Sequence, residues 1–60
     1  MNKKVVDMLD KVVRTFGLED ERTIYFTTLC ELYERNWYVS MTKLEIEFEE
    51  IMKESVSEEE

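Results

Sequence analysis

Histidine and proline are absent from this 60-residue chain, and glycine and cysteine each occur once. Because Cys30 has no second cysteine to pair with, an intrachain disulfide is excluded. A structural zinc site takes its ligands mainly from cysteine and histidine, so the chain has no plausible ligand set for one. Chains this short bury only about 60% of the surface that they expose when unfolded. We therefore expect self-association or docking on a partner to supply further stability.

Long hydrophobic runs are also absent. No apolar run approaches the roughly 20 residues that a membrane-spanning helix needs. The N-terminal segment has the lysines of a signal peptide, but Asp7, Asp10 and Lys11 interrupt its apolar part. An unpaired cysteine fits a reducing compartment. We therefore expect a cytoplasmic protein that has no membrane partner.

No constellation typical of catalysis is visible in the sequence. There is no glycine-rich phosphate loop, and no histidine that could act as a base for a serine or cysteine nucleophile. Glu31 and Glu34 follow Cys30 closely and should raise the pKa of its thiol, so we expect a buried structural cysteine. Whether Cys30 has a redox role is left open. We expect no enzyme activity, no cofactor and no small-molecule substrate.

Acidic residues outnumber basic ones, 15 to 8, for a formal net charge of −7. Residues 1–18 carry a net charge of +2, residues 19–36 carry −3, and residues 37–60 carry −6. Such a surface repels nucleic acid, and a helix-turn-helix made from the last two segments would present glutamates to DNA phosphates. We expect no direct nucleic-acid binding. The basic first segment should instead lie against the acidic last one.

Apolar residues recur at helical spacing in three segments. This pattern predicts an all-α fold, a small three-helix unit with helices near residues 3–16, 19–36 and 41–54. Residues 1–54 would form a single helical domain, and residues 55–60 a frayed acidic tail. The hydrophobic fraction of 43% is sufficient for a packed core. Because the unit is so small, we predict that dimerisation completes it.

The first helix should end at the only glycine. Val5, Leu9 and Val12 form its apolar stripe. Gly17 follows this stripe, where helices commonly place a left-handed residue. Leu18 would then fold back onto the last helical turn.

The middle segment, residues 20–38, holds all the tyrosines and the tryptophan. Asp20 is placed to cap its helix. An apolar arc of about 160° includes Tyr25 and Leu29, whereas Thr23 falls on the polar side. This arc is wider than one neighbouring helix needs. It predicts contacts with two neighbours, or with one neighbour and a second subunit.

The last segment has two interpretations. Residues 43–49 alternate between polar and apolar, as in a half-buried strand, yet the apolar residues from Met41 to Met52 also form a helical stripe. The length of the pattern and its content of Glu, Lys and Leu favour a helix. Thr42 and Glu45 match a capping box at its start. A strand at 43–49 remains the alternative.

Four residues are candidates for a partner-binding surface: Ile24, Trp37, Tyr38 and Ile46. Trp37 and Tyr38 are of the types that dominate binding energy at interfaces, although Trp37 could also cover the core. Ile24 and Ile46 lie off the main apolar stripes, so an isolated subunit would expose them. We therefore predict a non-enzymatic protein–protein interaction module or small regulator. It would be homodimeric, binding a protein partner, itself or both through this apolar and aromatic surface.

The glutamates of the last segment carry an alternative hypothesis. A stiff row of carboxylates can imitate the phosphates of nucleic acid, which would make the chain an acidic inhibitor of a nucleic-acid-binding protein. The residues of this row are Glu45, Glu47, Glu49, Glu50 and Glu54. We expect no metal site among them, because dinuclear carboxylate sites in helical bundles use Glu-x-x-His motifs and calcium loops need a central glycine.

Overall fold

The computed structural model describes residues 2–57, with side chains as far as Ser55, and within that range the chain forms three helices and no strand. Helix α1 spans Lys3–Phe16, α2 spans Glu21–Glu34 and α3 spans Met41–Ser57. The prediction of a small all-α three-helix unit is confirmed. Residues 43–49 are helical, so the alternative of a strand is wrong. Helix α3 continues through residues 55–57 of the predicted tail, and residues 58–60 lie outside the described residues.

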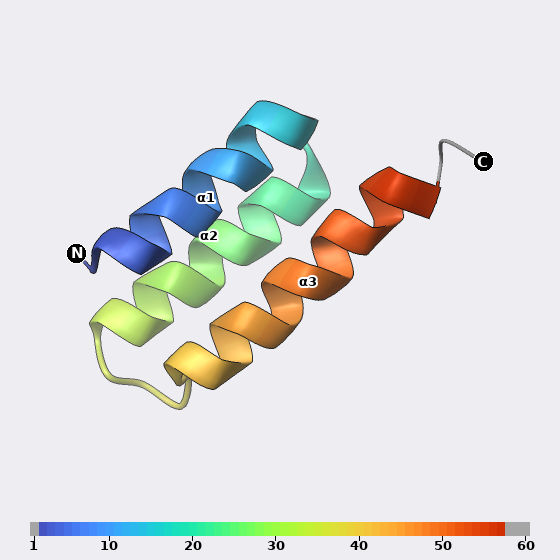
Figure 1. Cartoon of the computed structure of the whole chain (residues 1–60). Helices are drawn as coiled ribbons and strands as arrows, with labels where there is room; N and C mark the ends of the chain where they lie inside the picture. The colour runs from blue at the N-terminus through green and yellow to red at the C-terminus, as the bar shows by residue number, and fades with distance from the viewer. Residues whose placement is uncertain (1, 58–60) are drawn as a thin grey trace.

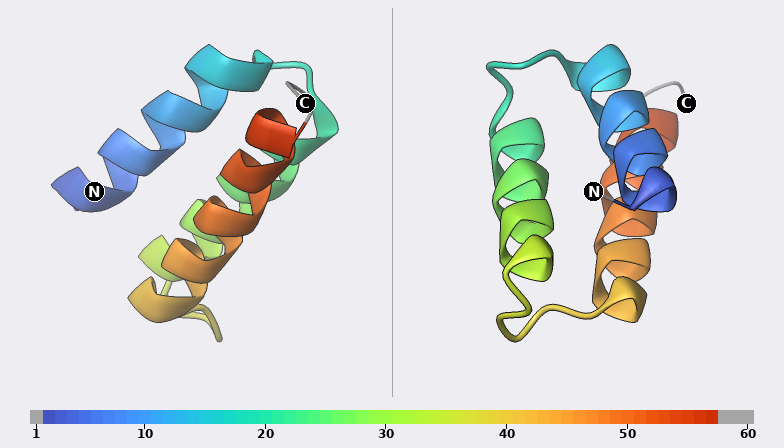
Figure 2. Two further views of the ribbon diagram at one scale, coloured as in Figure 1. Left: turned by 45° about the vertical axis from the view of Figure 1, so that its right-hand side comes forward. Right: turned by 90° about the vertical axis from the view of Figure 1, so that its left-hand side faces the viewer.

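The three helices form an up-down-up bundle. Helices α1 and α3 run in one direction and α2 runs in the other (Figure 1). Figure 2 shows α2 and α3 running side by side, whereas α1 is tilted relative to them. The two connections are short, so consecutive helices are antiparallel neighbours.

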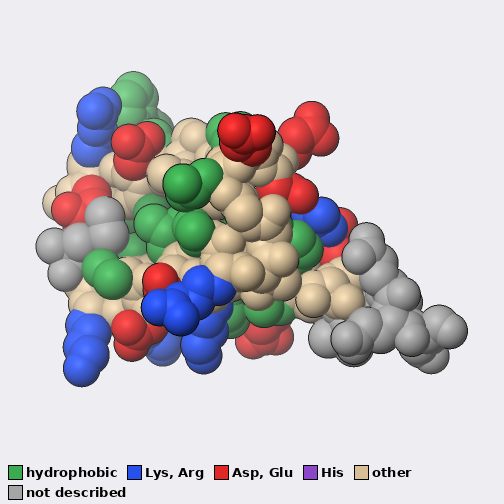
Figure 3. All heavy atoms as spheres, turned by 90° about the horizontal axis from the view of Figure 1, so that it is seen from above, with side chains coloured by type: hydrophobic (Ala, Val, Ile, Leu, Met, Phe, Trp, Pro, Cys, Tyr) green, Lys and Arg blue, Asp and Glu red, His purple; other side chains and the backbone are tan. Residues whose placement is uncertain are grey.

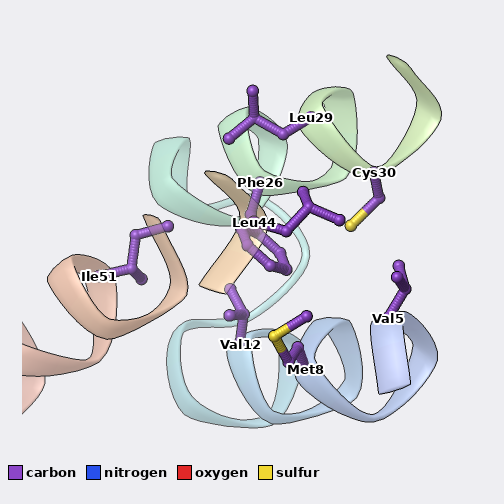
Figure 4. Packing of buried hydrophobic residues seen from close by; sticks show 8 residues of the cluster. All are labelled: Val5, Met8, Val12, Phe26, Leu29, Cys30, Leu44 and Ile51. Atoms are coloured by element: carbon purple, nitrogen blue, oxygen red, sulfur yellow. The ribbon is translucent and has the colours of Figure 1, made fainter. Parts of the chain in front are cut away.

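The core contains apolar residues from every helix. Its fully buried members include Val5 and Val12 on α1, Phe26 on α2 and Leu44 on α3. In Figure 4, Met8, Val12, Phe26 and Leu44 point toward one another at the centre of this cluster. The stripes predicted for the first and last helices therefore face the core as expected. Dimerisation is not tested by these contacts and stays a prediction.

Polar side chains start each helix. Asn2 Oδ1 accepts a hydrogen bond from the Lys4 N–H at 2.7 Å, and Asp20 Oδ1 accepts one from the Arg22 N–H at 2.8 Å. These bonds satisfy N–H groups that have no partner inside the helix. The predicted cap at Asp20 is confirmed. The cap of α3 was assigned wrongly, because Ser40 Oγ, not Thr42, accepts the Lys43 N–H at 3.2 Å.

Gly17 ends α1 in a conformation that differs from the prediction. Its φ is +91°, which favours glycine, but its ψ of 160° is far from the left-handed helical value. The chain therefore leaves the helix in an extended direction. Leu18 is 73% exposed, so the prediction that it folds back on the last turn is wrong.

Helix α2 is rotated relative to its predicted orientation. Thr23, placed on the polar side by the sequence pattern, is 1% exposed, and Tyr25, placed in the apolar arc, is 47% exposed. The reason is that α2 packs on both α1 and α3, so the direction of its buried arc depends on where both neighbours lie. Of the two alternatives predicted for α2, contact with two neighbouring helices is the one that the bundle shows.

Candidate protein-binding surface

The connection between α2 and α3 begins with a helix stop centred on Asn36. The Asn36 N–H donates to the Tyr33 carbonyl at 3.0 Å, and the Trp37 N–H donates to the Leu32 carbonyl at 2.9 Å. Asn36 itself has a φ of +56°. These are the features of a Schellman motif, in which a left-handed residue turns the chain back over the last helical turn. Asparagine adopts this conformation more readily than most residues that have a side chain.

This motif places an aromatic pair at one end of the bundle, where the connection leaves α2 (Figure 1). Leu32, Trp37 and Tyr38 line an open apolar depression of about 270 Å³, and we call these three residues the aromatic corner. The ring centroids of Trp37 and Tyr38 are 6.0 Å apart, with their planes at 41°. Such tilted geometry is favourable for aromatic pairs. Leu32 was missed as a site residue, although its position five residues before Trp37 is that of the hydrophobic contact in a Schellman motif.

Exposure separates the aromatic corner from the core. Trp37 is 55% exposed and Tyr38 is 95% exposed. Tyr38 also has a φ of +60°, a backbone conformation that L-residues other than glycine, asparagine and aspartate seldom adopt. Trp37 and Tyr38 therefore present most of their side-chain surface to solvent and do not belong to the buried core.

The two candidate isoleucines lie on different helices. Ile24 on α2 and Ile46 on α3 are each 54% exposed, as expected from the sequence. Ile24 is two residues from Phe26, and Ile46 is two residues from Leu44; both of these neighbours are fully buried. Each isoleucine therefore points about 160° away from its buried neighbour around the helix axis. They therefore project from the outer sides of two helices and do not converge. On the face shown in Figure 3, hydrophobic side chains are interspersed with acidic and basic ones.

The glutamates of α3 are divided between its two flanks. Glu45 forms an ion pair with Lys4 of α1, whereas Glu54 approaches Arg22 of α2 at 3.4 Å. The pair between Lys4 and Glu45 confirms that the basic first segment meets the acidic last one. Glu47 accepts a hydrogen bond from Lys43 at 2.8 Å, which raises the pKa of the Lys43 ammonium group.

Glu49 and Glu50 are the exposed members of the glutamate set that form no ion pair with any described residue. Consecutive glutamates at 45, 47 and 49 are about 160° apart around the axis, so the five carboxylates do not form one row. Among the described residues, no group of three or more potential ligands is arranged to hold a metal ion. None of the described helices has the length and apolar character needed to cross a membrane.

Arg22 connects three parts of the bundle, a role that the sequence did not reveal. Its guanidinium group donates two hydrogen bonds to the Asp20 carboxylate, each 2.9 Å long, and lies 4.0 Å from the centre of the Phe16 ring. The hydrogen bonds from the Arg22 side chain and backbone lower the pKa of Asp20 to about 2. Arg22 therefore joins the end of α1, the start of α2 and Glu54 near the end of α3.

Comparisons of the chain with protein-family models, with curated proteins and with solved structures found no match.

Proposed function

We propose that this chain is a non-enzymatic protein-interaction module that contacts its partner through the aromatic corner. The observation that supports this function best is the conformation of Tyr38. Its backbone is left-handed and its side chain is almost completely exposed. A left-handed backbone costs an L-residue roughly 1–2 kcal/mol. Among the described residues, the ring of Trp37 is the only aromatic neighbour of Tyr38, so its side chain offsets little of that cost by packing.

Residues held in sparsely populated backbone conformations cluster at functional sites, where binding requires them. Tryptophan and tyrosine supply large contact areas with few rotatable bonds, and they dominate the binding energy at many interfaces. The depression that Leu32, Trp37 and Tyr38 line is apolar. These properties suit a partner that inserts an apolar side chain. A role as a small regulator and a cytoplasmic location belong to the same proposal.

The acidic-inhibitor hypothesis has less support. Three of its five carboxylates are already paired with cations of the same chain, through Lys4, Arg22 and Lys43. A protein that replaces nucleic acid must offer unpaired charges along one direction. Of these five carboxylates, only Glu49 and Glu50 form no ion pair with a described residue.

A pull-down with substituted chains tests the function. A tagged chain is mixed with extract of the source cells and washed at about 0.1 M or about 1 M salt. At the higher concentration the Debye length falls to roughly 3 Å, which removes contacts that depend on charge. We expect a specific protein, or an untagged copy of the chain, to remain bound in both washes. Trp37→Ala and Tyr38→Ala should each abolish this capture, because they remove the apolar contact.

Leu18→Ala is the matched control, because Leu18 is an exposed apolar residue in the other connection. The control should capture the partner as the unsubstituted chain does. Equal capture by the control and by both aromatic substitutions would contradict the proposal, as would capture of nothing. A partner that high salt releases and that Glu49→Gln with Glu50→Gln removes would favour the acidic inhibitor instead.

A further inference from the structure

We infer that the partner at the aromatic corner is a second copy of the chain, which packs Ile46 into the depression of the corner and places Glu49 and Glu50 beside Arg35. This inference rests on the proposed function and names its partner. We call Ile46, Glu49 and Glu50 the Ile46 face. The two surfaces complement each other both in their apolar groups and in their charges.

The Ile46 face presents one apolar side chain flanked by two carboxylates. Ile46 is 54% exposed on the outer side of α3, and Glu49 and Glu50 follow it by three and four residues. Residues at these spacings are neighbours on one helical face. Neither carboxylate is paired with a described cation, so both can accept a new partner without breaking an existing ion pair.

The aromatic corner has one exposed cation beside it. Glu31 and Glu34 lie on the α2 side of the corner and Lys43 is already paired with Glu47, so Arg35 is the cation that the corner can offer to a second copy. Arg35 is exposed directly beside the corner and forms no ion pair with a described residue. Its guanidinium group can hold a carboxylate through parallel hydrogen bonds. Two copies of so acidic a chain repel each other over most of their surface, so an unpaired arginine beside an apolar depression favours contact at that place.

The positions of the two surfaces suit a closed dimer. The corner immediately precedes α3, and Ile46 lies five residues after the first residue of α3, about 7.5 Å along the axis. Both surfaces are therefore at the same end of the bundle (Figure 1). A two-fold axis beside the start of α3 lets each corner receive the Ile46 face of the other copy. The contact then forms twice and leaves no free surface for further growth.

Sedimentation equilibrium of the full chain tests this dimer, at concentrations from roughly 1 μM to 1 mM, the range of weak interfaces. We expect a monomer–dimer equilibrium. Ile46→Asp and Trp37→Ala should each raise the dissociation constant roughly thirtyfold or more, as substitutions at central interface residues do. Leu18→Asp is the control, because it adds the same charge at an exposed leucine in the other connection, and it should leave the dissociation constant within about twofold.

Charge reversal tests the pairing itself. Arg35→Glu, and Glu49→Lys combined with Glu50→Lys, should each weaken the dimer by roughly three- to tenfold. All three substitutions in one chain should restore the original dissociation constant, because the symmetric dimer then has reversed pairs at both contacts. Circular dichroism verifies that every variant keeps its helices.

Three outcomes would overturn the inference. A chain that stays monomeric throughout, while Trp37→Ala still abolishes capture of another protein, would leave the proposed function standing without this partner. If neither Ile46→Asp nor Trp37→Ala changes the dissociation constant, the dimer forms through a different surface. Failure of the three charge reversals to restore association would exclude the pairing of Arg35 with the Ile46 face.

Discussion

The hydroxyl group of Thr23 is buried in the bundle, and its Oγ1 has no hydrogen-bond partner among the described residues. Leaving a buried hydroxyl unsatisfied costs about 1–3 kcal/mol. Thr23→Val keeps the shape of the side chain and removes the hydroxyl. We expect this substitution to increase the free energy of unfolding by about 1 kcal/mol, measured by urea denaturation.

Thr28→Val is the control for this experiment. It has the same effect on helix propensity, but Thr28 is exposed and its hydroxyl donates to the Ile24 carbonyl at 3.0 Å. The control should change stability by less than about 0.5 kcal/mol. If Thr23→Val destabilises the chain, then the hydroxyl has a partner in solution.

Cys30 is a second buried residue whose chemistry follows from its surroundings. Its side chain is 1% exposed, and burial, with a smaller contribution from the charge of Glu31, raises the pKa of its thiol to about 11. Because the thiolate is the reactive form, we expect very slow modification of the folded chain by a thiol reagent at neutral pH. Urea should accelerate the reaction by orders of magnitude. Fast modification of the folded chain would instead support a redox role.

At the scale of the helices, the start of α2 depends on the charge of Asp20. Its pKa is about 2 in the folded chain, below the ordinary value of 3.8. A lowered pKa means that the charged carboxylate stabilises the fold above about pH 4, and that this contribution is lost as the pH falls toward 2. Asp20→Asn retains a capping oxygen but removes the charge. We expect it to lower the melting temperature at pH 6 and to have little effect at pH 2.

Glu19→Gln removes a charge one residue earlier and is the control, because no hydrogen bond or ion pair joins the Glu19 side chain to a described residue. The melting temperature of Glu19→Gln, relative to the unsubstituted chain, should not show the change between pH 6 and pH 2 that is expected for Asp20→Asn. A melting-temperature difference for Asp20→Asn that stays constant from pH 6 to pH 2 would show that the interaction with Arg22 is not electrostatic.

The backbone of the connection before α3 gives another prediction. Because Tyr38 has a φ of +60°, Tyr38→Gly should be more stable than Tyr38→Ala by about 1 kcal/mol, measured by chemical denaturation. Val39 does not have a positive φ, so glycine should be less stable than alanine there. If alanine is the more stable substitution at position 38, then the strain on which the proposed function depends is absent.

At the scale of the whole molecule, stability is limited by the size of the core. Among the side chains that the structure describes, eight apolar ones make up the buried cluster, and a domain of this length is marginal by itself. Exposed ion pairs such as Lys4–Glu45 contribute only about 0–1 kcal/mol each. A second copy bound at the aromatic corner would therefore add a large share of the total stability.

The concentration dependence of unfolding measures that share. A partner that binds only the folded chain raises the melting temperature by mass action. We expect the melting temperature to rise by several degrees over a roughly hundredfold increase in protein concentration. With Trp37→Ala the melting temperature should not depend on concentration. A concentration-independent value for the unsubstituted chain would show that the monomer is stable by itself.

Local patterns in the sequence were sufficient to locate the helices and one of their caps. The spacing of Val5, Val12, Leu44 and Ile51 defines helical stripes, and such spacing depends only on residues a few positions apart. The exposure of Ile46 followed from the same geometry, since it lies far from the α3 stripe around the helix axis. Ile24 also lay outside the apolar arc predicted for α2, although that arc was itself misplaced. The aromatic corner was foreseen in part, from Trp37 and Tyr38.

The rest was decided by contacts between distant parts of the chain. Whether Thr23 or Tyr25 faces the core depends on where α1 and α3 both meet α2, which no local pattern contains. In the same way, Lys4 and Arg22 select Glu45 and Glu54 as partners from a set of similar glutamates. The sequence by itself therefore determined which segments are helical and which of their residues are apolar. Only the tertiary structure decided how far each helix is rotated, which charges are paired, and that Leu32 joins Trp37 and Tyr38 in one surface, because these features arise from packing across the bundle.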